Sequence, residues 1–390
     1  MAKLCSWKRA GAGLAFLIAA MSASSAQTVT TLASFDGSNG SYPLWMSLVQ
    51  GTDGNFYGVT QYGGTGTSCS LGCGTVFKVT PEGVLKSLHS FDGSDGEYPQ
   101  GGVIQATDGN FYGITTKGGA NGEGTIFKIT STGTLTTVYN FCPNTGCSGP
   151  FDVFAGLVQG SDGSFYGTSQ GGGDYFDGTV YKVTPAGQLT TLHSFDGTDG
   201  LFPQSPLIQA TNGSFYGTTF QGGTQDSCVD GCGTVFRITA AGDFSTVYDF
   251  CAESDCTDGW APYSGVVQGS DGNFYGTTYE AATGTVFKLT PTGTLTTLYN
   301  FGSEGPPEAG LVQGTDGKFY GTSCCAGSSG DGYLFNITSG GTFTTLVNFD
   351  GTNGANVYSY LVQGTTASST ALLAPAGLAT KAQSSASRWG

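Results

Sequence analysis

Charged side chains and histidines are scarce in this chain of 390 residues. Only 11% of its residues are charged and two are histidines, His89 and His193, whereas about a quarter of an average chain is charged. Both histidines fall at one place in a repeated segment, where other copies have Tyr, Val or Ala. Histidine is therefore one choice among packing residues there. Sequence motifs of hydrolases, zinc peptidases and phosphate-binding loops are absent, so we name no catalytic residue.

A hydrophobic run long enough to span a membrane is also absent. The apolar run from Gly11 to Met21 has 11 residues, whereas a membrane helix needs about 20. Lys3, Lys8 and Arg9 precede this run and Ser24-Ser25-Ala26 follows it, which is typical of a secretory signal with its cleavage site. We predict a signal peptide over residues 1–26 and a secreted protein, extracellular, periplasmic or on the cell surface, with no membrane insertion after cleavage.

Positive charge is scarce as well. The chain has 13 Lys and Arg against 28 Asp and Glu, a net charge of −15. Removing the three basic residues of the predicted signal would make it −18 (−15 − 3). Because such a surface repels phosphate backbones, we expect no nucleic-acid partner.

Glycine is abundant, with 67 residues, and it marks an internal repeat. Gly-Asn-Phe-Tyr-Gly or a near variant recurs six times, 45 to 59 residues apart, each time after an Asp-Gly or Asn-Gly pair that suits a two-residue hairpin turn. The phenylalanines of this motif are expected in the core between units. Carbohydrate stacking, and thus ligand binding, is the alternative that we keep for the tyrosines, Tyr57, Tyr112, Tyr166, Tyr216, Tyr275 and Tyr320.

The repeat predicts the fold class. Each unit has four strand-like segments, as propeller blades do. The first-strand and fourth-strand patterns each occur seven times, but the second and third only six times. We predict an all-β β-propeller over residues 27–365, a single domain of repeats of ~52 residues. It would have about seven four-stranded blades, the last one incomplete and clasped by a strand over 28–35 and an inner strand from the C-terminal end. Six blades plus an overhanging strand is the alternative.

The repeat stops after Thr365, and residues 366–390 are rich in Ala, Ser and Leu without turn signals. We expect this tail to be disordered. Its codons suggest a cause: taking the third base of each codon with the first two bases of the next lets Thr366 to Leu373 spell Asp-Gly-Lys-Phe-Tyr-Gly-Thr-Thr. These are the repeat residues that should follow Thr365, so we hypothesise a shift of the reading frame.

Three segments carry a family resemblance: Asp-Gly-Asn-Phe-Tyr-Gly-Thr-Thr, Gly-Thr-Val-Phe-Lys-Leu-Thr-Pro and Leu-Thr-Thr-Leu-Tyr-x-Phe. They resemble the GloVer-type tandem repeat of choice-of-anchor bacterial proteins, over residues 28 to 365. The resemblance implies a secreted or surface-attached bacterial protein and transfers no activity. The sequence departs from this family in having no recognisable C-terminal sorting anchor.

The chain has 11 cysteines. Apart from Cys5, the cysteines form five close pairs, and such a content favours an oxidising compartment. Zinc is the competing interpretation, but each pair stands alone in the sequence without a nearby His. Cys324 and Cys325 are adjacent, and we leave their state open. We predict local disulfides for the other four pairs, Cys69/Cys73, Cys142/Cys147, Cys228/Cys232 and Cys251/Cys256.

One acidic loop is repeated in the pattern Phe-Asp-Gly-Ser/Thr-Asp/Asn-Gly. Two side-chain oxygens three residues apart could help to hold Ca²⁺, which takes six to eight oxygen ligands. Tight-turn chemistry explains the same residues, and no other cofactor is expected. The carboxylates concerned are Asp36, Asp92, Asp95, Asp196, Asp199 and Asp350.

These features favour a non-enzymatic binding or scaffold protein, secreted or on the surface. We expect a monomer whose partner is an extracellular glycan or protein. The alternative is an extracellular propeller enzyme, because the Asp-Gly-Asn-aromatic hairpin also looks similar to that of streptogramin-lyase propellers. It would be a lyase or glycosidase that acts on a polysaccharide or small molecule, with an acid and base facing the axis.

Overall fold

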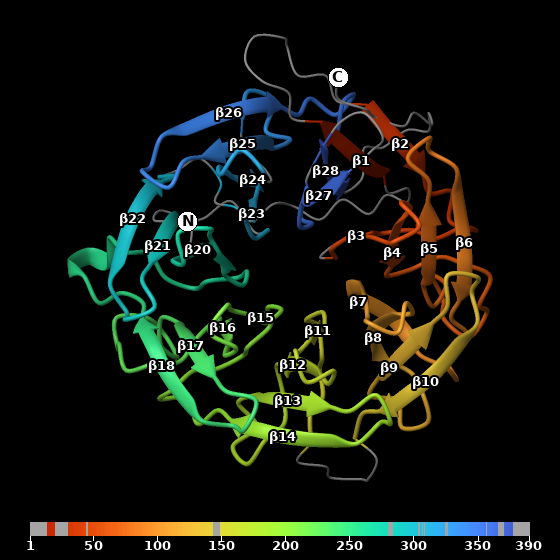
Figure 1. Ribbon diagram of the computed structural model, residues 1–390, viewed down its shortest axis with the longest axis horizontal. Helices are drawn as coiled ribbons and strands as arrows, with labels where there is room; N and C mark the ends of the chain where they lie inside the picture. The colour runs from red at the N-terminus through yellow and green to blue at the C-terminus, as the bar shows by residue number, and fades with distance from the viewer. Residues whose placement is uncertain are drawn as a thin grey trace.

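The strands form a ring of sheets around a central axis (Figure 1). The computed structural model describes residues 14–19, 30–43, 46–142, 149–279, 284–302, 305, 307, 309–323, 327–355, 357–365 and 370–376. Six blades are built from four consecutive antiparallel strands each. The only helical segment among the described residues is one 3-10 turn, Ser254–Cys256, and none of them forms a helix that could cross a membrane. The all-β propeller prediction is confirmed.

The blades follow one another along the chain, each running from its inner to its outer strand. Blade one has β3 (Val49–Gln50), β4 (Phe56–Thr60), β5 (Thr75–Val79) and β6 (Leu85–Ser90), and blade two has β7 (Glu97–Gln105), β8 (Phe111–Lys117), β9 (Thr125–Ile129) and β10 (Leu135–Asn140). Blade three has β11 (Val158–Gln159), β12 (Phe165–Ser169), β13 (Thr179–Val183) and β14 (Leu189–Ser194), and blade four has β15 (Ile208–Gln209), β16 (Phe215–Thr219), β17 (Thr234–Ile238) and β18 (Phe244–Asp249). Blade five has β19 (Val267–Gln268), β20 (Phe274–Thr277), β21 (Thr285–Leu289) and β22 (Leu295–Asn300), and blade six has β23 (Val312–Gln313), β24 (Phe319–Ser323), β25 (Tyr333–Ile337) and β26 (Phe343–Asn348).

The place of a seventh blade holds a sheet of mixed origin, so the prediction of about seven repeat blades is wrong by one. Its order is β2 (Thr30–Ser34), β1 (Leu14–Ala19), β28 (Thr370–Ala376) and β27 (Val362–Thr365). The two predicted clasp strands, β2 and β27, do lie at opposite edges of one sheet. The middle positions, however, belong to β1 and β28, which carry no repeat sequence.

This closing sheet includes parts of both predicted terminal segments. β28 lies in the tail that we expected to be disordered, so the tail is not disordered over Thr370–Ala376. β1 lies within the predicted signal peptide, whose cleavage stays a prediction. The other residues of the signal and of the tail lie outside the described residues.

The second strand of each blade is buried along its length, as in β4 and β12. The outer strands, such as β6, have intermediate and exposed side chains, as expected of a sheet edge that faces solvent. The repeated phenylalanines Phe56, Phe111, Phe165, Phe215, Phe274 and Phe319 are at most 1% exposed. Each therefore contributes about 1.5 to 3 kcal/mol of hydrophobic stabilisation, which confirms the predicted core between blades.

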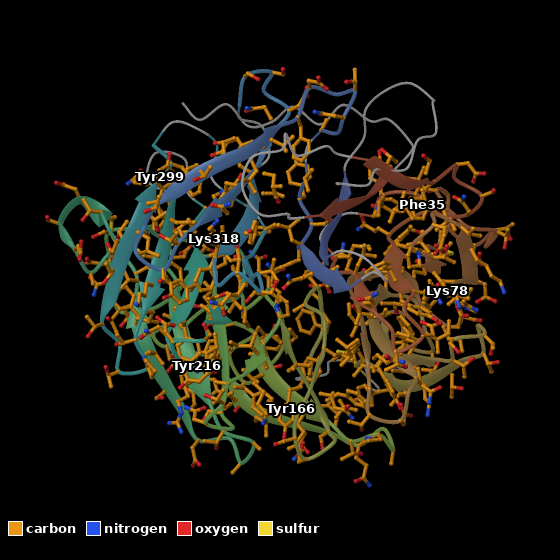
Figure 2. The ribbon with its side chains drawn as sticks, turned by 45° about the horizontal axis from the view of Figure 1, so that its top comes forward. Phe35, Lys78, Tyr166, Tyr216, Tyr299 and Lys318 are labelled. Carbon is orange, nitrogen blue, oxygen red and sulfur yellow. A yellow bond between two sulfur atoms is a disulfide. The ribbon has the colours of Figure 1, made fainter. Side chains whose placement is uncertain are left out.

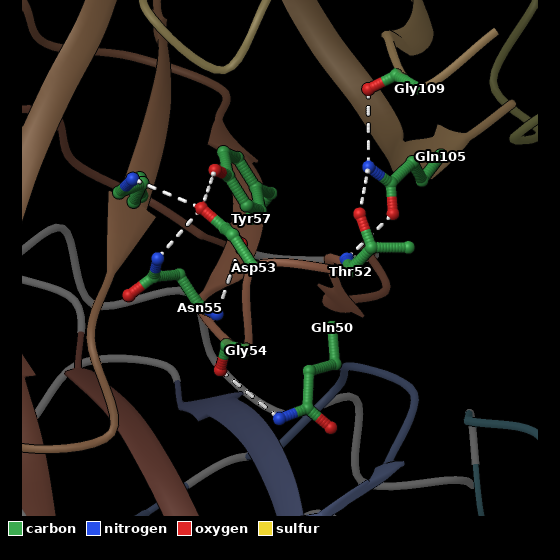
Figure 3. Close-up of polar contacts among 9 residues, drawn as sticks. Gln50, Thr52, Asp53, Gly54, Asn55, Tyr57, Gln105 and Gly109 are labelled. Carbon is green, nitrogen blue, oxygen red and sulfur yellow. Dashed lines mark hydrogen bonds and ion pairs between the residues drawn. The ribbon is translucent and has the colours of Figure 1, made fainter.

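From blade two onward, a glutamine at the end of the inner strand joins its blade to the preceding one. The side-chain oxygen of Gln105 accepts a bond from the backbone N–H of Thr52 (2.8 Å), and its amide donates to the carbonyl of Gly109 (3.1 Å) (Figure 3). The last contact of this series, from Gln363 to the Thr315 hydroxyl, places β27 against blade six. The other inter-blade contacts are those of Gln159, Gln209, Gln268 and Gln313.

The Asp-Gly turns differ in detail from the expected two-residue hairpin. In blade one, Gly54 has φ 81° but Asp53 is not left-handed. The Gly54 N–H donates to the Gly51 carbonyl, and the Gly51 N–H donates to the Asn55 carbonyl. The loop is thus longer than two residues, because a type I′ turn would need positive φ at both central positions.

Candidate functional site

In blades one to five the chain approaches the axis of the ring through a left-handed residue that precedes the inner strand or, in blade two, lies near its start. In blade five this residue is Ala261, with φ 54°. Two hydrogen bonds hold it: its N–H donates to the Cys232 carbonyl of the preceding blade (2.8 Å), and its carbonyl accepts from the Tyr279 N–H (3.1 Å). A non-glycine residue in this region costs about 1–3 kcal/mol. Equivalent residues are Tyr42, Tyr98, Asp152 and Phe202, with φ of 55°, 55°, 49° and 55°.

Two residues beyond these positions, side chains from different blades meet in a pocket of about 280 Å³. The lining side chains that carry a hydrogen-bonding group are Gln100, Gln170, Gln204, Tyr263, Tyr358 and Tyr360. These residues come from blades two to five and from the segment before β27. Because members of opposite sides of the ring line one space, the pocket lies on the axis. Gln170 directly follows β12, so the pocket is at the end of the ring from which the loops between second and third strands emerge.

The chemistry of the pocket is neutral. None of its lining residues among the described part of the chain is charged; the remainder are Gly101, Phe154, Ala155, Gly156 and Pro206. The amide of Gln170 donates to the side-chain oxygen of Gln204 (3.2 Å), which holds both groups in place. Burial raises the pKa of the Tyr360 phenol, although a backbone hydrogen bond from Gly265 opposes this, so the phenol is a neutral polar group in the pocket. The pocket therefore offers amide and phenol groups together with aromatic faces.

None of these lining residues was predicted from the sequence, although a signal was present. Gln100, Phe154, Gln204, Tyr263 and Tyr358 each stand three residues before the first apolar residue of an inner strand. The residue type varies between units at this position, while the strand that follows keeps its pattern. Glu308 has the same place in unit six of the sequence, but it lies outside the described residues.

The tyrosines that we predicted as ligand-binding are instead buried between blades. Their exposed fractions are 0–4%. Tyr166, for example, stacks on Phe215 of the next blade with ring centroids 3.9 Å apart, and Figure 2 shows Tyr166 and Tyr216 in neighbouring blades. A sugar could not stack on these rings without displacing the phenylalanine. The other stacked or tilted pairs are Tyr57–Phe111, Tyr112–Phe165, Tyr216–Phe274 and Tyr275–Phe319.

Each of these tyrosines is anchored by the side chain of its turn. In blade one the Tyr57 hydroxyl donates to Asp53 (2.7 Å), which also accepts from Asn55 (2.7 Å) and Lys78 (3.2 Å) (Figure 3). Partial burial alone would raise the pKa of the Asp53 carboxyl, but these hydrogen bonds outweigh it and lower the pKa to about 2. The same balance lowers the pKa of Asp162 to about 2. These clusters are therefore structural.

The acidic loops use their carboxylates to form turns. Asp92 accepts bonds from the hydroxyl (2.7 Å) and N–H (2.9 Å) of Ser94, and these bonds lower its pKa. Asp95 contacts the ring nitrogen Nε2 of His89 at 2.6 Å, and Asp199 contacts His193 in the same way. Equivalent turns hold Asp36, Asp196 and Asp350. The two histidines lie on the outer strands β6 and β14. Calcium binding by these acidic loops stays a prediction.

Three of the four predicted disulfides are present: Cys69–Cys73, Cys228–Cys232 and Cys251–Cys256. Cys142 is also disulfide-bonded, while its predicted partner, Cys147, lies outside the described residues, as do Cys324 and Cys325. In the part of the chain that the structure describes, one group of three potential metal ligands comes within 4.8 Å, and it consists of Cys228, Cys232 and Cys251. The disulfides indicate an oxidising environment.

Comparison with known proteins gives a family match. A family model described as the Gloeobacter/Verrucomicrobia repeat matches residues 9–155 and 152–372, which is most of the chain. It agrees with the resemblance found in the repeat motifs. No curated protein matches the sequence.

Solved structures with the same fold have little sequence in common with this chain. A putative 6-phosphogluconolactonase from Bacteroides uniformis has 15% identity and a TM-score of 0.50, covering 85% of this chain and 95% of its own. One from Bacteroides fragilis has 17% identity and a TM-score of 0.50, covering 85% and 93%. A protein from Lactobacillus plantarum has 15% identity and a TM-score of 0.52, covering 86% and 95%. At such identities the likeness shows the fold alone.

Proposed function

The chain belongs to the Gloeobacter/Verrucomicrobia repeat family, and on that premise we propose that it is a secreted binding protein whose axial pocket takes an uncharged, hydroxyl-rich ligand such as the end of a neutral glycan. The observation that carries the proposal is the lining of the pocket: three glutamines and three tyrosines from separate parts of the ring, with no charged residue among the described lining.

The lining groups suit hydroxyls. Each glutamine offers both a donor and an acceptor, and each phenol can do either, so one sugar hydroxyl can bridge two of them. The tyrosine rings add an apolar face beside a polar tip. A charged ligand would lose its hydration in this pocket without finding an opposite charge, which is costly.

The net charge of the whole chain also favours an uncharged ligand over an anionic one. A net charge of −15 disfavours phosphorylated and other anionic ligands at a distance. Two of the solved structures above carry the name of an enzyme of a phosphorylated sugar lactone, but recognition of phosphate normally uses Arg or Lys, and neither is found among the described lining residues. The fold likeness therefore does not favour that substrate here.

An extracellular lyase or glycosidase is the second candidate. Such an enzyme would need a general acid and base within reach of the bound ligand. The two His–Asp pairs are on outer strands rather than in the axial pocket. Incubation with polysaccharides and sugar lactones would distinguish the candidates: we expect no turnover above that of a Tyr263→Ala variant, and turnover abolished by this substitution would establish the enzyme.

Binding is tested with the full chain on an array of neutral and anionic glycans, followed by calorimetry of the best ligand. Gln204→Ala and Tyr263→Phe each remove one hydrogen-bonding group of about 1 to 1.5 kcal/mol, so we expect each to weaken binding about tenfold. Gln188→Ala is the matched control, because Gln188 is exposed in the turn between the third and fourth strands of blade three, at the opposite end of the ring from the pocket. Selective binding of anionic glycans, or equal affinity in all variants, would overturn the proposal.

A further inference from the structure

Blade four brings together two cysteine pairs that are separate in the sequence. Cys228–Cys232 lies in the loop between β16 and β17, and Cys251–Cys256 follows β18. The Sγ atoms of Cys228, Cys232 and Cys251 all lie within 4.8 Å of one another, and Cys256 is bonded to Cys251. The premise that each pair stands alone, which disfavoured a metal site, therefore does not hold in this blade.

The other blades provide an internal comparison. Blade one has the first pair, Cys69–Cys73, but Asp92 stands where blade four has Cys251 after the Phe that ends the outer strand. Blade two has Cys142 and Cys147 in that second place but no cysteine between β8 and β9. Blade four alone combines both pairs in its sequence.

The surroundings of the four sulfur atoms suit a soft cation. Cys232 and Cys251 are only 1% and 5% exposed, and all four cysteines pack in one apolar cluster with Trp260. Zinc binds four thiolates tetrahedrally with Zn–S bonds of about 2.3 Å, which requires sulfur atoms about 3.8 Å apart. In the oxidised form Cys228 and Cys232 are bonded at 2.05 Å, while the Sγ atoms of Cys228, Cys232 and Cys251 all lie within 4.8 Å, so reduction has only to separate the bonded atoms of each pair by about 2 Å to reach the spacing of a zinc site. The two loops, residues 224–233 and 250–259, contain five acidic residues and no Lys or Arg, which favours cations.

We propose that, in its reduced form, blade four binds one soft divalent cation such as Zn²⁺ through Cys228, Cys232, Cys251 and Cys256. In the oxidised form the same atoms form two disulfides. Reduction takes two electrons and two protons per disulfide from a dithiol, which itself becomes a cyclic disulfide. The cation then displaces the thiol protons as it binds the sulfur atoms, so metal binding releases up to four protons.

The cluster is also connected to the axial pocket. The carbonyl of Cys232 accepts the hydrogen bond of Ala261, the left-handed residue that directs Tyr263 towards the axis. Exchange of disulfides for a metal would alter the backbone at Cys232. The metal-bound and oxidised forms should therefore differ in the fluorescence of Trp260, because Trp260 directly precedes Ala261 in the sequence.

The test uses the full chain with Cys324→Ser and Cys325→Ser as background, reduced with excess dithiothreitol and desalted without oxygen. Co²⁺ serves as the spectroscopic probe and Zn²⁺ as competitor. We expect one equivalent of Co²⁺ with the absorption of tetrahedral thiolate coordination, displaced by Zn²⁺. The oxidised chain should give no such spectrum, and reduction should restore it.

Paired substitutions assign the site. Cys251→Ser with Cys256→Ser should weaken Co²⁺ binding by more than the roughly 10- to 100-fold that loss of a supporting outer-shell group costs, whereas Cys69→Ser with Cys73→Ser should leave the blade-four signal intact. Circular dichroism of both variants checks that they fold, and the single Cys251→Ser variant replaces the pair if it does not. A wild-type spectrum without thiolate coordination, or an equal loss in the two pairs, would overturn the proposal.

Discussion

The hydrogen bond between the repeated tyrosine and its turn is the residue-scale feature that recurs through the blades. Tyr275 illustrates it: the ring is fully buried against Phe319, and its hydroxyl donates to Asp271 at 2.8 Å. Blade four uses Asn212 in the same role, with its amide donating to the Tyr216 hydroxyl. The ring thus packs between blades while its polar end stays bonded at the rim.

Removal of this hydroxyl should destabilise the propeller without changing its shape. Tyr275→Phe keeps the ring but leaves Asp271 with one donor fewer, so we expect a loss of about 1.5 kcal/mol in the free energy of unfolding, measured by urea denaturation. Tyr175→Phe, on an exposed loop, should change it by less than about 0.5 kcal/mol. Equal stability of the two variants would contradict the assigned role.

The turn carboxylates also predict the response to acid. Asp53 and Asp162 have pKa values lowered to about 2 in the folded chain, against about 3.9 when unfolded. A group with a lowered folded pKa stabilises the fold above its unfolded pKa, and this stability is lost as the pH falls through the folded value. Stability should therefore fall between about pH 4 and pH 2, modestly because these carboxylates are partly exposed.

Urea denaturation at pH 7, 4, 3 and 2 measures this dependence. Asp162→Asn copies the residue that blade four already has, so it should fold and should flatten the slope below pH 4. A variant with an unchanged slope would show that acid acts through other groups.

At the scale of elements, the inter-blade glutamines connect each inner strand to the turn of the preceding blade. The side-chain oxygen of Gln313 accepts from the Ser270 N–H at 2.9 Å, and its amide donates to the Gly317 carbonyl at 3.1 Å. Two blades are therefore joined by one side chain in addition to their apolar packing.

Gln313→Ala should lower the free energy of unfolding by about 1 kcal/mol, because water replaces these bonds only in part. Gln188→Ala, in an exposed turn of blade three, is the control and should have little effect. Native-state hydrogen exchange should locate the change at β19 and β23; faster exchange elsewhere only would argue against an inter-blade role.

The strands and turns could be predicted because each unit carries its own local signals, and six copies repeat them. The disulfides of the short loops were predictable for the same reason, since three of the four are seen and each is closed within one loop. The axial pocket could not be predicted. It depends on side chains such as Gln100 and Tyr358, which are far apart in the sequence and meet only when the ring closes.

The closure of the ring is a property of the whole molecule. The predicted number of blades was wrong because the N-terminal and C-terminal segments supply two strands of the closing sheet, β1 and β28, that carry no repeat sequence. The contacts of the repeat nevertheless continue around the ring. In blade three, Gly160 lies so close to Phe215 of the next blade that a Cβ atom on this glycine would be 3.0 Å from the ring. Gly364 of β27 approaches Phe56 of blade one in the same way, and its Cβ would be 2.6 Å from the ring. In five blades the tyrosine stacks on the phenylalanine of the next blade, but the chain beyond blade six has no Phe-Tyr motif for Tyr320.

A restored reading frame would supply this missing motif. The genetic code allows the codons after Thr365, read in the shifted frame, to spell Asp-Gly-Lys-Phe-Tyr-Gly, and the phenylalanine of this motif would then take the place of the stacking partner of Tyr320. Removal of the predicted signal would also remove β1, which lies between β2 and β28, and unpaired strand edges favour aggregation.

Sequencing of the gene tests this directly, and a different base sequence after the Thr365 codon would end the hypothesis. If the bases agree, the frame-restored chain should complete the seventh blade. Its melting temperature should then exceed that of the present chain, and an equal or lower value would contradict the structural argument.

The central claim is that the axial pocket is the binding site, and hydrogen–deuterium exchange with and without the best neutral glycan tests it most directly. We predict slower exchange at the axial segments, residues 98–101, 153–156, 203–206, 261–264 and 357–361, with little change in the loops that carry Leu71 and Val229. Protection confined to those loops, with none at the axial segments, would contradict the account.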